Sequence, residues 1–476
     1  MTINNNSFDN IIERLDKNVI GLLLFFIVCM VIVRYSSFSK LVIGHDESTY
    51  LEIAREWFNG KTLYKDVIDI KPVGIYGVFG FLQFIGIKSI FGLRLISSIF
   101  LGLGAFSLNR LVFRWSKNSL ASLITGLVFV FLHSFYFSLD INTETYFTLF
   151  IVFGITLGVI GIDQENKIKL FLAGLLIGLA FIIKYLAIME GLAFGVMILL
   201  GLKRDKGKSI ALFVLGGIIP FAVVNVCFWL AGNWEAFYFV TYLAPFKYNA
   251  SSNSSYVVII ERMVLFFLPV LVIVPLLYKA NKKTLLLISI WLICSFIAIL
   301  LPKKPFSHYW IQMFAPISVI VGFSFSVLQN KAKSVIILPI IILLVLIGVR
   351  VNKMNTHFAK ADSAKEVIDY IVSIIKPSES FFCANFEQVA YYILKKDSPT
   401  PYIHKSILYR DSHQRTLAID GKEELLKIIA QEPTYITVRG NYPVAWFQEY
   451  LNTNYVVLKK FGDIRVLKLC QKPNSL

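Results

Sequence analysis

The chain is short of charged residues. Asp, Glu, Lys and Arg make up 16% of its 476 residues, whereas a soluble protein carries roughly 25%. Hydrophobic residues make up 56% of the chain, and the mean hydropathy is +0.67. This composition excludes an ordinary soluble protein and predicts an α-helical polytopic membrane protein.

The sequence also lacks the motifs of several reaction classes. It contains no HExxH metal site, no GxSxG nucleophile elbow and no Walker loop, so ATP-driven chemistry is not expected. No cofactor is predicted, although a divalent cation held between carboxylates is compatible with the sequence. The chain shows no heptads, low-complexity tracts or convincing repeats.

Cysteine is scarce and carries little information. Of five cysteines, three lie inside apolar runs. Cys383 and Cys470 lie in the polar tail, where we expect two free thiols rather than a disulfide. The first apolar run is long and lacks a small-residue cleavage site, so it resembles a signal anchor more than a cleaved signal peptide.

Long apolar runs are abundant. Reading them at about 20 residues each predicts about eleven membrane spans, at 19–36, 94–113, 119–138, 145–162, 168–184, 187–202, 210–231, 257–278, 284–301, 309–328 and 335–350. The run 73–92 is apolar but interrupted by glycines and Lys88. It is either a further span or a hairpin lying in the membrane interface.

The net charge of +17 decides between these two topologies. The basic residues sit in short loops rather than in a stripe with interleaved aromatics, so nucleic-acid binding is not expected. If 73–92 does not cross and the N-terminus is cytoplasmic, nearly all basic clusters lie on the inner side, as the positive-inside rule requires. The sequence therefore predicts a multi-pass protein of the inner (plasma) membrane with a cytoplasmic N-terminus.

This topology brings acids and isolated lysines to one outer face, where ionisable groups beside hydrocarbon indicate a functional site. The aromatic loop 232–256 is expected there too. The predicted members of this face are Asp46, Glu47, Asp66, Asp69, Lys71, Asp140, Glu144, Lys184, Lys303, Lys304 and His308.

The stretch that follows the first span, HDESTYLEIAREWF, predicts an amphipathic helix on the membrane surface. Asp46 and Glu47 fall in its first turn, where acids are also common as mere helix starts. Glu144 has a similar alternative, since Asn142 or Thr143 could cap the next helix. Lys71 precedes Pro72, which stiffens the turn; its ammonium suits a phosphate, or else extends to lipid headgroups.

The composition turns polar beyond residue 350, which divides the chain into domains 1–350 and 351–476. Helix-period stretches at 364–375, 423–429 and 444–451 alternate with β-rich runs at 380–384, 435–438, 455–458 and 464–469. We predict a small α/β domain on the extracytoplasmic side.

Four segments carry a resemblance to a known family: GHDESTYLEIAREWFNGKTLYKDVIDIKPVGIY, LDINTETYF, AFIIKYLA and KKPFSHYW. In these, the chain resembles the bacterial polyprenyl-phosphate-dependent glycosyltransferases of the GT-C superfamily. The similar branch contains the protein mannosyltransferases and the lipid A aminoarabinose transferase. Ile70 and Thr49 depart from the aminoarabinose enzyme, so the sugar and the acceptor (lipid, glycan or protein) stay open.

The resemblance implies transfer of a sugar from a polyprenyl-phosphate carrier to an acceptor hydroxyl. It implies a catalytic role for Asp46, with Glu47 beside it, and places Glu144 at the second acidic position. The implied donor-phosphate residues are Lys71, Lys184, Lys303, Lys304, His308 and Tyr309. Further candidates for substrate binding are Tyr50, Tyr64, Asp66, Asp69 and Asp140.

Two other function classes fit the composition. A lipid-linked sugar flippase would need polar residues along a path through its spans, and this chain has few of them. A non-enzymatic membrane scaffold is the third interpretation. Release of polyprenyl phosphate from a labelled donor separates the enzyme from both.

Overall fold

A computed structural model describes residues 18–250, 255–271, 277, 281–326, 334–360 and 362–470. The chain forms two compact units, each assembled from three segments. The first, here called the helical unit, comprises 1–39, 89–226 and 253–359. The second, here called the mixed unit, comprises 40–88, 227–252 and 360–476.

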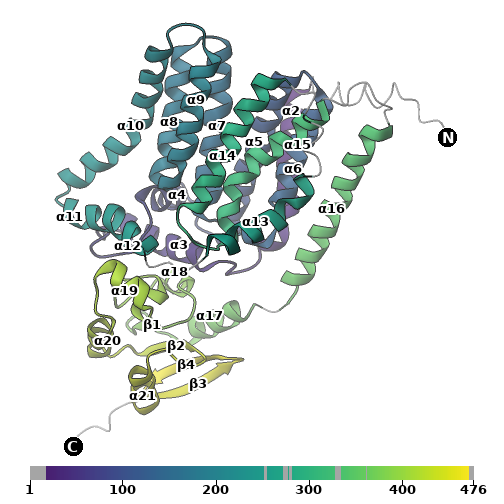
Figure 1. Cartoon of the computed structure of the whole chain (residues 1–476). Helices are drawn as coiled ribbons and strands as arrows, with labels where there is room; N and C mark the ends of the chain where they lie inside the picture. The colour runs from purple at the N-terminus through teal and green to yellow at the C-terminus, as the bar shows by residue number, and fades with distance from the viewer. Residues whose placement is uncertain are drawn as a thin grey trace, which may run out of the picture. The chain divides into compact units, whose positions relative to one another are not determined.

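The helical unit has a helix at every predicted span position (Figure 1). These helices are α2 (Val19–Arg34), α5 (Ile90–Ser116), α6 (Ser119–Leu132), α7 (Thr143–Asp163), α8 (Lys167–Ile183), α9 (Ile188–Gly201), α10 (Lys206–Leu230), α13 (Tyr256–Leu271), α14 (Lys282–Leu300), α15 (Ile311–Ser326) and α16 (Ser334–Phe358). Short 3-10 turns occupy Tyr35–Ser37, Tyr136–Ser138, Tyr185–Ala187 and Ser307–Trp310. Most of the predicted span 257–278 beyond Leu271 lies outside the described residues.

Within the described residues, 7 helical stretches are long and apolar enough to cross a membrane. They are Val19–Ser37, Ile90–Ser116, Thr143–Asp163, Lys206–Leu230, Lys282–Leu300, Ser307–Ser326 and Ile340–Ile374. The chain is thus a multi-pass membrane protein. The ambiguous run 73–92 contains α4 (Val73–Phe84), which has 12 residues and a length of about 18 Å. Like Ser119–Leu132 and Tyr185–Gly201, it is one of the shorter apolar helices of 10–17 residues, so the non-crossing topology stays a prediction.

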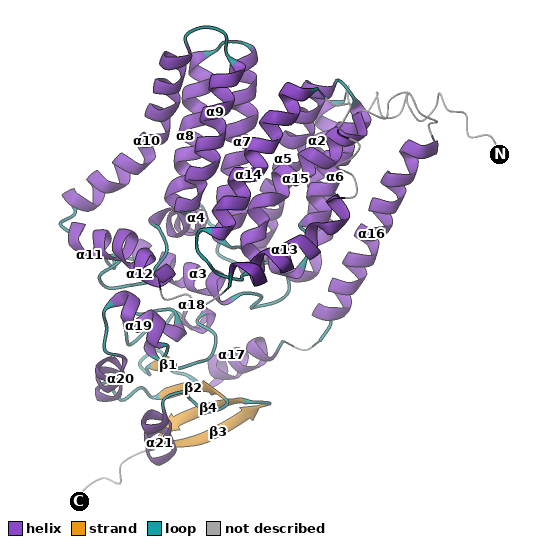
Figure 2. Ribbon diagram, viewed as in Figure 1, coloured by secondary structure: helices purple, strands orange, loops and turns teal. Residues whose placement is uncertain are grey.

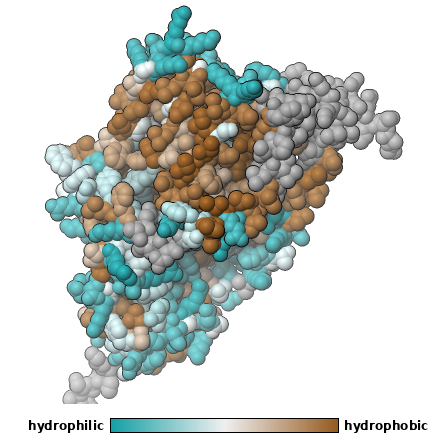
Figure 3. Space-filling view, viewed as in Figure 1, coloured by the Kyte–Doolittle hydropathy of each residue, from teal (hydrophilic) through white to brown (hydrophobic). Residues whose placement is uncertain are grey.

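The helices of the helical unit pack closely. α15 lies against α6, α2 lies against α5, and α7 pairs with α8. A Cβ on Gly178 of α8 would come within 2.3 Å of the Gly217 carbonyl oxygen of α10, so only glycine allows this approach. Hydrophobic side chains, brown in Figure 3, cover much of the visible helical surface, and several on α10 are more than half exposed, among them Val223, Trp229 and Leu230. Such a surface suits lipid.

The mixed unit contains both helices and strands, which are purple and orange in Figure 2. It holds α3 (His45–Phe58), α4, α11 (Trp234–Tyr238), a π-helical turn Phe239–Leu243 and α12 (Ala244–Ala250). The predicted aromatic loop 232–256 is therefore largely helical as far as residue 250, and 251–254 lie outside the described residues. The C-terminal helices are α17 (Ser363–Ile374), α18 (Val389–Leu394), α19 (Asp411–Leu417), α20 (Gly421–Ala430) and α21 (Ala445–Asn454).

The C-terminal segment builds a four-stranded sheet in the order β1-β2-β4-β3. β1 (Phe381–Cys383) runs parallel to β2 (Tyr435–Arg439), while β4 (Ile464–Leu469) is antiparallel to β2 and to β3 (Tyr455–Phe461). Gly462, with φ of 60°, makes the β3–β4 turn in a conformation that suits glycine. The predicted combination of strands and helices in the C-terminal segment is confirmed, with α18 and α19 as helices that the sequence analysis missed. The division into domains 1–350 and 351–476 stays a prediction.

Local chemistry explains these C-terminal elements. Asp362 and Asp420 cap α17 and α20 by accepting backbone N–H bonds from the first turn of each helix. The sheet and helices enclose a buried core that includes Phe382, Ile436 and Phe447. Cys383 and Cys470 are both free thiols.

Candidate functional site

α3 places Asp46 and Glu47 in its first turn. Gly44 precedes the helix in an extended conformation, and the helix dipole favours carboxylates at this end. The expected apolar face is buried, with Tyr50, Ile53 and Ala54 all at 0% exposure. The opposite face is buried as well, which departs from a helix with one solvated polar face. The buried polar residues of α3 are Glu47, Ser48, Thr49, Glu52 and Glu56.

Asp46 is held between two cationic or polar partners. Lys71 Nζ lies 3.1 Å from Asp46 Oδ2, and His404 Nε2 lies 3.7 Å from Asp46 Oδ1. The Asp46 side chain keeps 25% exposure, so it remains accessible. The Lys71 ammonium also lies 5.8 Å from the centroid of the Tyr50 ring. Asp46 and Lys71, which the sequence analysis expected on the same membrane face, are thus in direct contact.

Two tyrosines form hydrogen bonds with the loop that contains Lys71. The buried Tyr64 hydroxyl donates to the Lys71 carbonyl oxygen at 2.8 Å, while its ring packs against Phe228 and Phe237. The Tyr76 hydroxyl donates to Asp69 Oδ2 at 3.0 Å. Tyr64 therefore positions Lys71 through the backbone.

The two other acids of this loop differ in environment. Asp69 is 4% exposed, and burial raises its pKa although the nearby Lys71 opposes the shift. Asp66 lies in an exposed turn, where the Thr62 N–H donates to its carboxylate at 2.8 Å and lowers its pKa. Asp69 lies close to the Asp46–Lys71 pair, whereas Asp66 stabilises the turn.

A buried carboxylate from the C-terminal segment holds the residue before Asp46. Glu387 Oε2 lies 2.7 Å from His45 Nδ1, and its other oxygen lies 3.5 Å from Lys405 Nζ and 3.0 Å from an Arg439 nitrogen. Burial alone would raise the pKa of Glu387, but the hydrogen bond with His45 and the charges of Lys405 and Arg439 outweigh it and lower the pKa to about 2. The start of α3 is anchored to the C-terminal segment.

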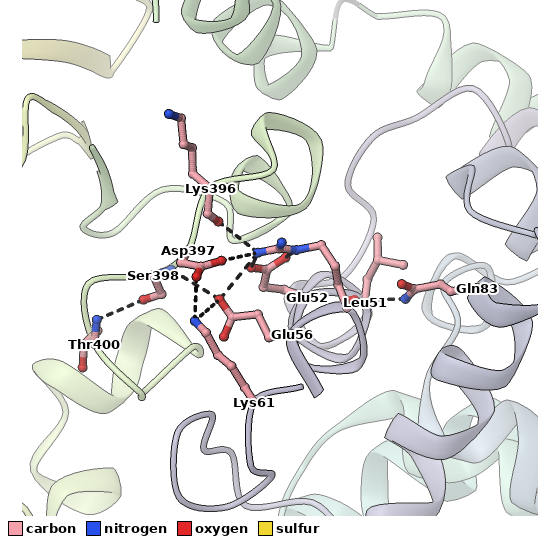
Figure 4. A network of polar contacts seen from close by, with 10 residues as sticks. Leu51, Glu52, Glu56, Lys61, Gln83, Lys396, Asp397, Ser398 and Thr400 are labelled. Carbon is pink, nitrogen blue, oxygen red and sulfur yellow. Dashed lines mark hydrogen bonds and ion pairs between the residues drawn. The ribbon is translucent and has the colours of Figure 1, made fainter. Parts of the chain in front are cut away.

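The other end of α3 is anchored by a network of ions (Figure 4). Arg55 contacts Glu52 at 2.6 Å, Glu56 at 3.5 Å and Asp397 at 3.2 Å. Lys61 lies 3.1 Å from both Glu56 and Asp397. This network explains how Glu52 and Glu56 of α3 can be buried, since both carboxylates are paired.

A second set of predicted residues meets in the helical unit. Glu144, buried in the first turn of α7, forms an ion pair with Lys184 at the end of α8. His308 Nε2 lies 4.0 Å from the same carboxylate, and the Lys184 ammonium lies 3.7 Å from the centroid of the Tyr309 ring. Asn142 makes no side-chain capping bond to α7, and Glu144 is engaged in ion pairs instead.

The remaining candidates lie in the loops of the same unit. Lys304 is buried, which lowers its pKa, and Lys303 Nζ lies 5.2 Å from the centroid of the Tyr256 ring. Asp140 is buried and accepts a hydrogen bond from Asn142 at 3.0 Å. The candidate residues thus form two sets, one in each unit, and their convergence on one membrane face stays a prediction.

The sequence analysis missed the residues of the C-terminal segment. No sequence motif surrounds His404 or Glu387. Their partners, Asp46 and His45, lie about 340 or more positions earlier in the chain, and no sequence pattern connects the two segments. The one available signal was histidine scarcity, since His45, His404 and His413 are three of 6 histidines. Among the described residues, no group of three or more His, Cys, Asp or Glu is placed to hold a metal ion.

Comparison with known proteins supports the family resemblance. Residues 71–229 match the family model described as dolichyl-phosphate-mannose-protein mannosyltransferase. No curated protein matches the sequence.

Solved structures match over most of the chain. ArnT from Cupriavidus metallidurans, bound to undecaprenyl phosphate, has a TM-score of 0.66 at 14% identity, covering 94% of this chain and 98% of ArnT. The apo oligosaccharyltransferase of Archaeoglobus fulgidus has a TM-score of 0.52 at 11% identity, covering 88% and 69%. AglB from Archaeoglobus fulgidus, in complex with an inhibitory peptide and a dolichol-phosphate, has a TM-score of 0.51 at 10% identity, covering 97% and 75%.

Proposed function

The chain belongs by its fold to the GT-C superfamily, and from this premise we propose that it is a membrane glycosyltransferase. Its donor is a sugar linked to polyprenyl phosphate, and its acceptor is a hydroxyl on a lipid, a glycan or a protein. The similar structures of ArnT and AglB contain undecaprenyl phosphate and a dolichol-phosphate, which supports a carrier of this class. The transfer takes place at the extracytoplasmic face of the plasma membrane, where the donor needs no nucleotide.

Asp46 acts as the base in this proposal. Its carboxylate takes the proton from the acceptor hydroxyl while the hydroxyl oxygen attacks the anomeric carbon opposite the phosphate. The bond from that carbon to the phosphate oxygen breaks, polyprenyl phosphate leaves, and the anomeric centre is inverted. The contact with Lys71 favours the ionised form of Asp46 that this step needs, and positioned base catalysis contributes about 10²–10⁴-fold.

Lys71 stabilises the departing phosphate in this proposal, and the helical unit carries a lysine in similar surroundings. Lys71 and Lys184 each hold an ammonium beside a carboxylate and an aromatic ring, and an ammonium is a compact partner for growing phosphate charge. Glu144 holds Lys184 in place and completes the second acidic position. The remaining residues proposed for the donor phosphate are Lys303, Lys304, His308 and Tyr309.

One observation carries the proposal: a partly exposed acid, Asp46, in direct contact with Lys71, within a chain that has the GT-C fold. The pair lies 25 residues apart in sequence, so the contact is made by the fold of the first loop. No metal-dependent step is needed for the displacement as written.

The test uses purified full-length protein and a panel of labelled undecaprenyl-phosphate sugars. Asp46→Asn keeps the size of the side chain but removes the base, so release of undecaprenyl phosphate falls by at least about 10²-fold. Asp369→Asn is the matched control, because Asp369 is 61% exposed in α17, and this variant keeps wild-type activity. Near-wild-type release by Asp46→Asn would remove Asp46 from the mechanism, and a transporter would release no carrier phosphate at all.

A further inference from the structure

The loop between α18 and α19 brings a histidine to the proposed base. The Ser406 backbone N–H donates to His404 Nδ1 at 3.4 Å, and the Ser406 hydroxyl lies 2.8 Å from the same nitrogen. A nitrogen that accepts a backbone N–H carries no proton, so the neutral ring holds its proton on Nε2. That nitrogen lies 3.7 Å from Asp46 Oδ1, which is longer than a hydrogen bond, so the ring faces the carboxylate with an N–H that has to move slightly closer before it can donate.

A second histidine continues this chain of donors. Ser406 Oγ lies 2.8 Å from His413 Nδ1. Because the Ser406 hydroxyl gives its only proton to His404, His413 must donate to the Ser406 oxygen. The His413 ring lies 5.4 Å from the ring of Tyr248. The donors therefore run in one direction, from His413 through Ser406 and His404 to Asp46.

We propose that His404 is a positioning residue for Asp46: its Nε2–H faces one carboxylate oxygen across 3.7 Å and donates to it when the two move closer, while Lys71 holds the other oxygen. This inference rests on the proposed function, in which Asp46 is the base. It assigns a role to the C-terminal segment, because that segment supplies His404, the second residue after Lys71 that positions Asp46. Burial lowers the pKa of His404 to about 4 and that of His413 to about 4, so both rings are neutral near pH 7, as the hydrogen-bond chain requires.

Other charged groups act on this contact, and each stays unchanged in the test. Those that influence Asp46, His404, His413 or the neighbouring Tyr248 electrostatically are Lys71, Asp69, His45, Lys405 and Arg410, and Glu387 holds His45 and Lys405. A change seen on replacing His404 alone therefore reports the His404–Asp46 contact.

Carbodiimide labelling of Asp46 tests the proposal without any need for activity. A carbodiimide reacts with the protonated carboxyl, so labelling against pH, quantified by peptide mass spectrometry, gives the pH of half-protonation. Loss of the N–H donor in His404→Ala moves this midpoint up by about half a unit to one unit. His404→Gln, whose amide can replace the Nε2–H, stays within a few tenths of wild type. The labelling midpoint of the Asp369 carboxyl, measured in the same digest, does not change.

The folding of each variant is checked by its apparent melting temperature. If His404→Ala melts early, His404→Phe replaces it, since a phenyl ring fills the site but offers no N–H. An Asp46 midpoint that is equal in wild type, the donor-free variant and His404→Gln overturns the proposal. So does a midpoint shift in His404→Gln as large as that in the donor-free variant, because that result would indicate packing alone.

Sugar transfer forms a separate arm of the experiment. With a donor that the wild type uses, the acidic limb of the rate–pH profile moves with the labelling midpoint in His404→Ala and returns in His404→Gln. If the wild type uses no donor of the panel and removal of the protein leaves surface glycans unchanged, the proposed function fails. The labelling result then still decides whether His404 supports Asp46.

Discussion

At the scale of single residues, the two lysines proposed for the phosphate occupy similar surroundings. Lys71 has Asp46 and the Tyr50 ring, and Lys184 has Glu144 and the Tyr309 ring. A carboxylate fixes the ammonium, and the aromatic face attracts its remaining positive charge. Each ammonium is thereby fixed in a position where it can bind an anion, and the neighbouring carboxylate balances its positive charge before the donor binds.

Replacing Lys184 tests this arrangement. Lys184→Gln removes the ammonium and leaves the buried Glu144 carboxylate with His308 at 4.0 Å. We expect release of polyprenyl phosphate to fall about 10²–10³-fold, the range seen when one electrostatic donor to a transition state is lost. Lys208→Gln, an exposed lysine of α10, is the control and keeps wild-type rates. Equal rates in both variants would exclude Lys184 from donor binding.

The residue scale also shows what the sequence could reveal. Asp46 and Lys71 could be identified from the sequence because they follow the end of an apolar run. Placing ionisable groups beside hydrocarbon costs free energy, so such groups indicate a functional site. The Glu144–Lys184–His308 contacts agree with an expectation drawn from charge placement alone. His404 could not be found, because its proximity to Asp46 depends on the fold of a segment that has no motif.

At the scale of elements, α3 departs most from expectation. Its apolar spacing predicted an amphipathic helix, yet both faces are buried. The reason lies in the ion network of Arg55 and Lys61, which pairs two buried carboxylates of α3 with a loop of the C-terminal segment. Periodicity shows which residues avoid water, but it cannot show that a later segment will cover the polar face.

Arg55 is the residue on which this burial depends. Arg55→Ala takes away the cation that contacts Glu52 and leaves Glu56 with Lys61, and breaking a buried pair costs about 3–5 kcal/mol. The apparent melting temperature of the purified protein should fall clearly.

The control for Arg55→Ala is Arg415→Ala. Arg415 and its partner Asp411 are 81% and 83% exposed, and such surface pairs contribute little, so this variant should melt like wild type. If the two variants melt alike, the network of Figure 4 does not stabilise α3.

At the scale of the whole molecule, the chain alternates between its two units. The segment after the first span, the segment after α10 and the C-terminal segment all join the mixed unit, although long stretches of the helical unit separate them. The existence and type of most elements followed from composition and periodicity. The sequence could not predict that α3 and the C-terminal segment belong to the same unit, because long-range packing leaves no local signal.

Sidedness is the claim on which the proposed enzyme depends most. The two sets of candidate residues lie in different units, and the positive-inside pattern predicts that both face outward. Exposed positions beside each set are available for cysteine labelling: Lys65 in the first loop, Tyr136 before α7 and Phe306 beside His308. Lys206, an exposed residue at the start of α10, is predicted to be cytoplasmic and serves as the control.

The measurement is made on spheroplasts that carry single-cysteine variants of a protein whose 5 native cysteines have been replaced. A membrane-impermeant maleimide should label Lys65→Cys, Tyr136→Cys and Phe306→Cys in intact spheroplasts, and Lys206→Cys only after permeabilisation. Labelling of Lys65→Cys from outside together with protection of Tyr136→Cys or Phe306→Cys would place the two sets on opposite sides of the membrane and contradict the account.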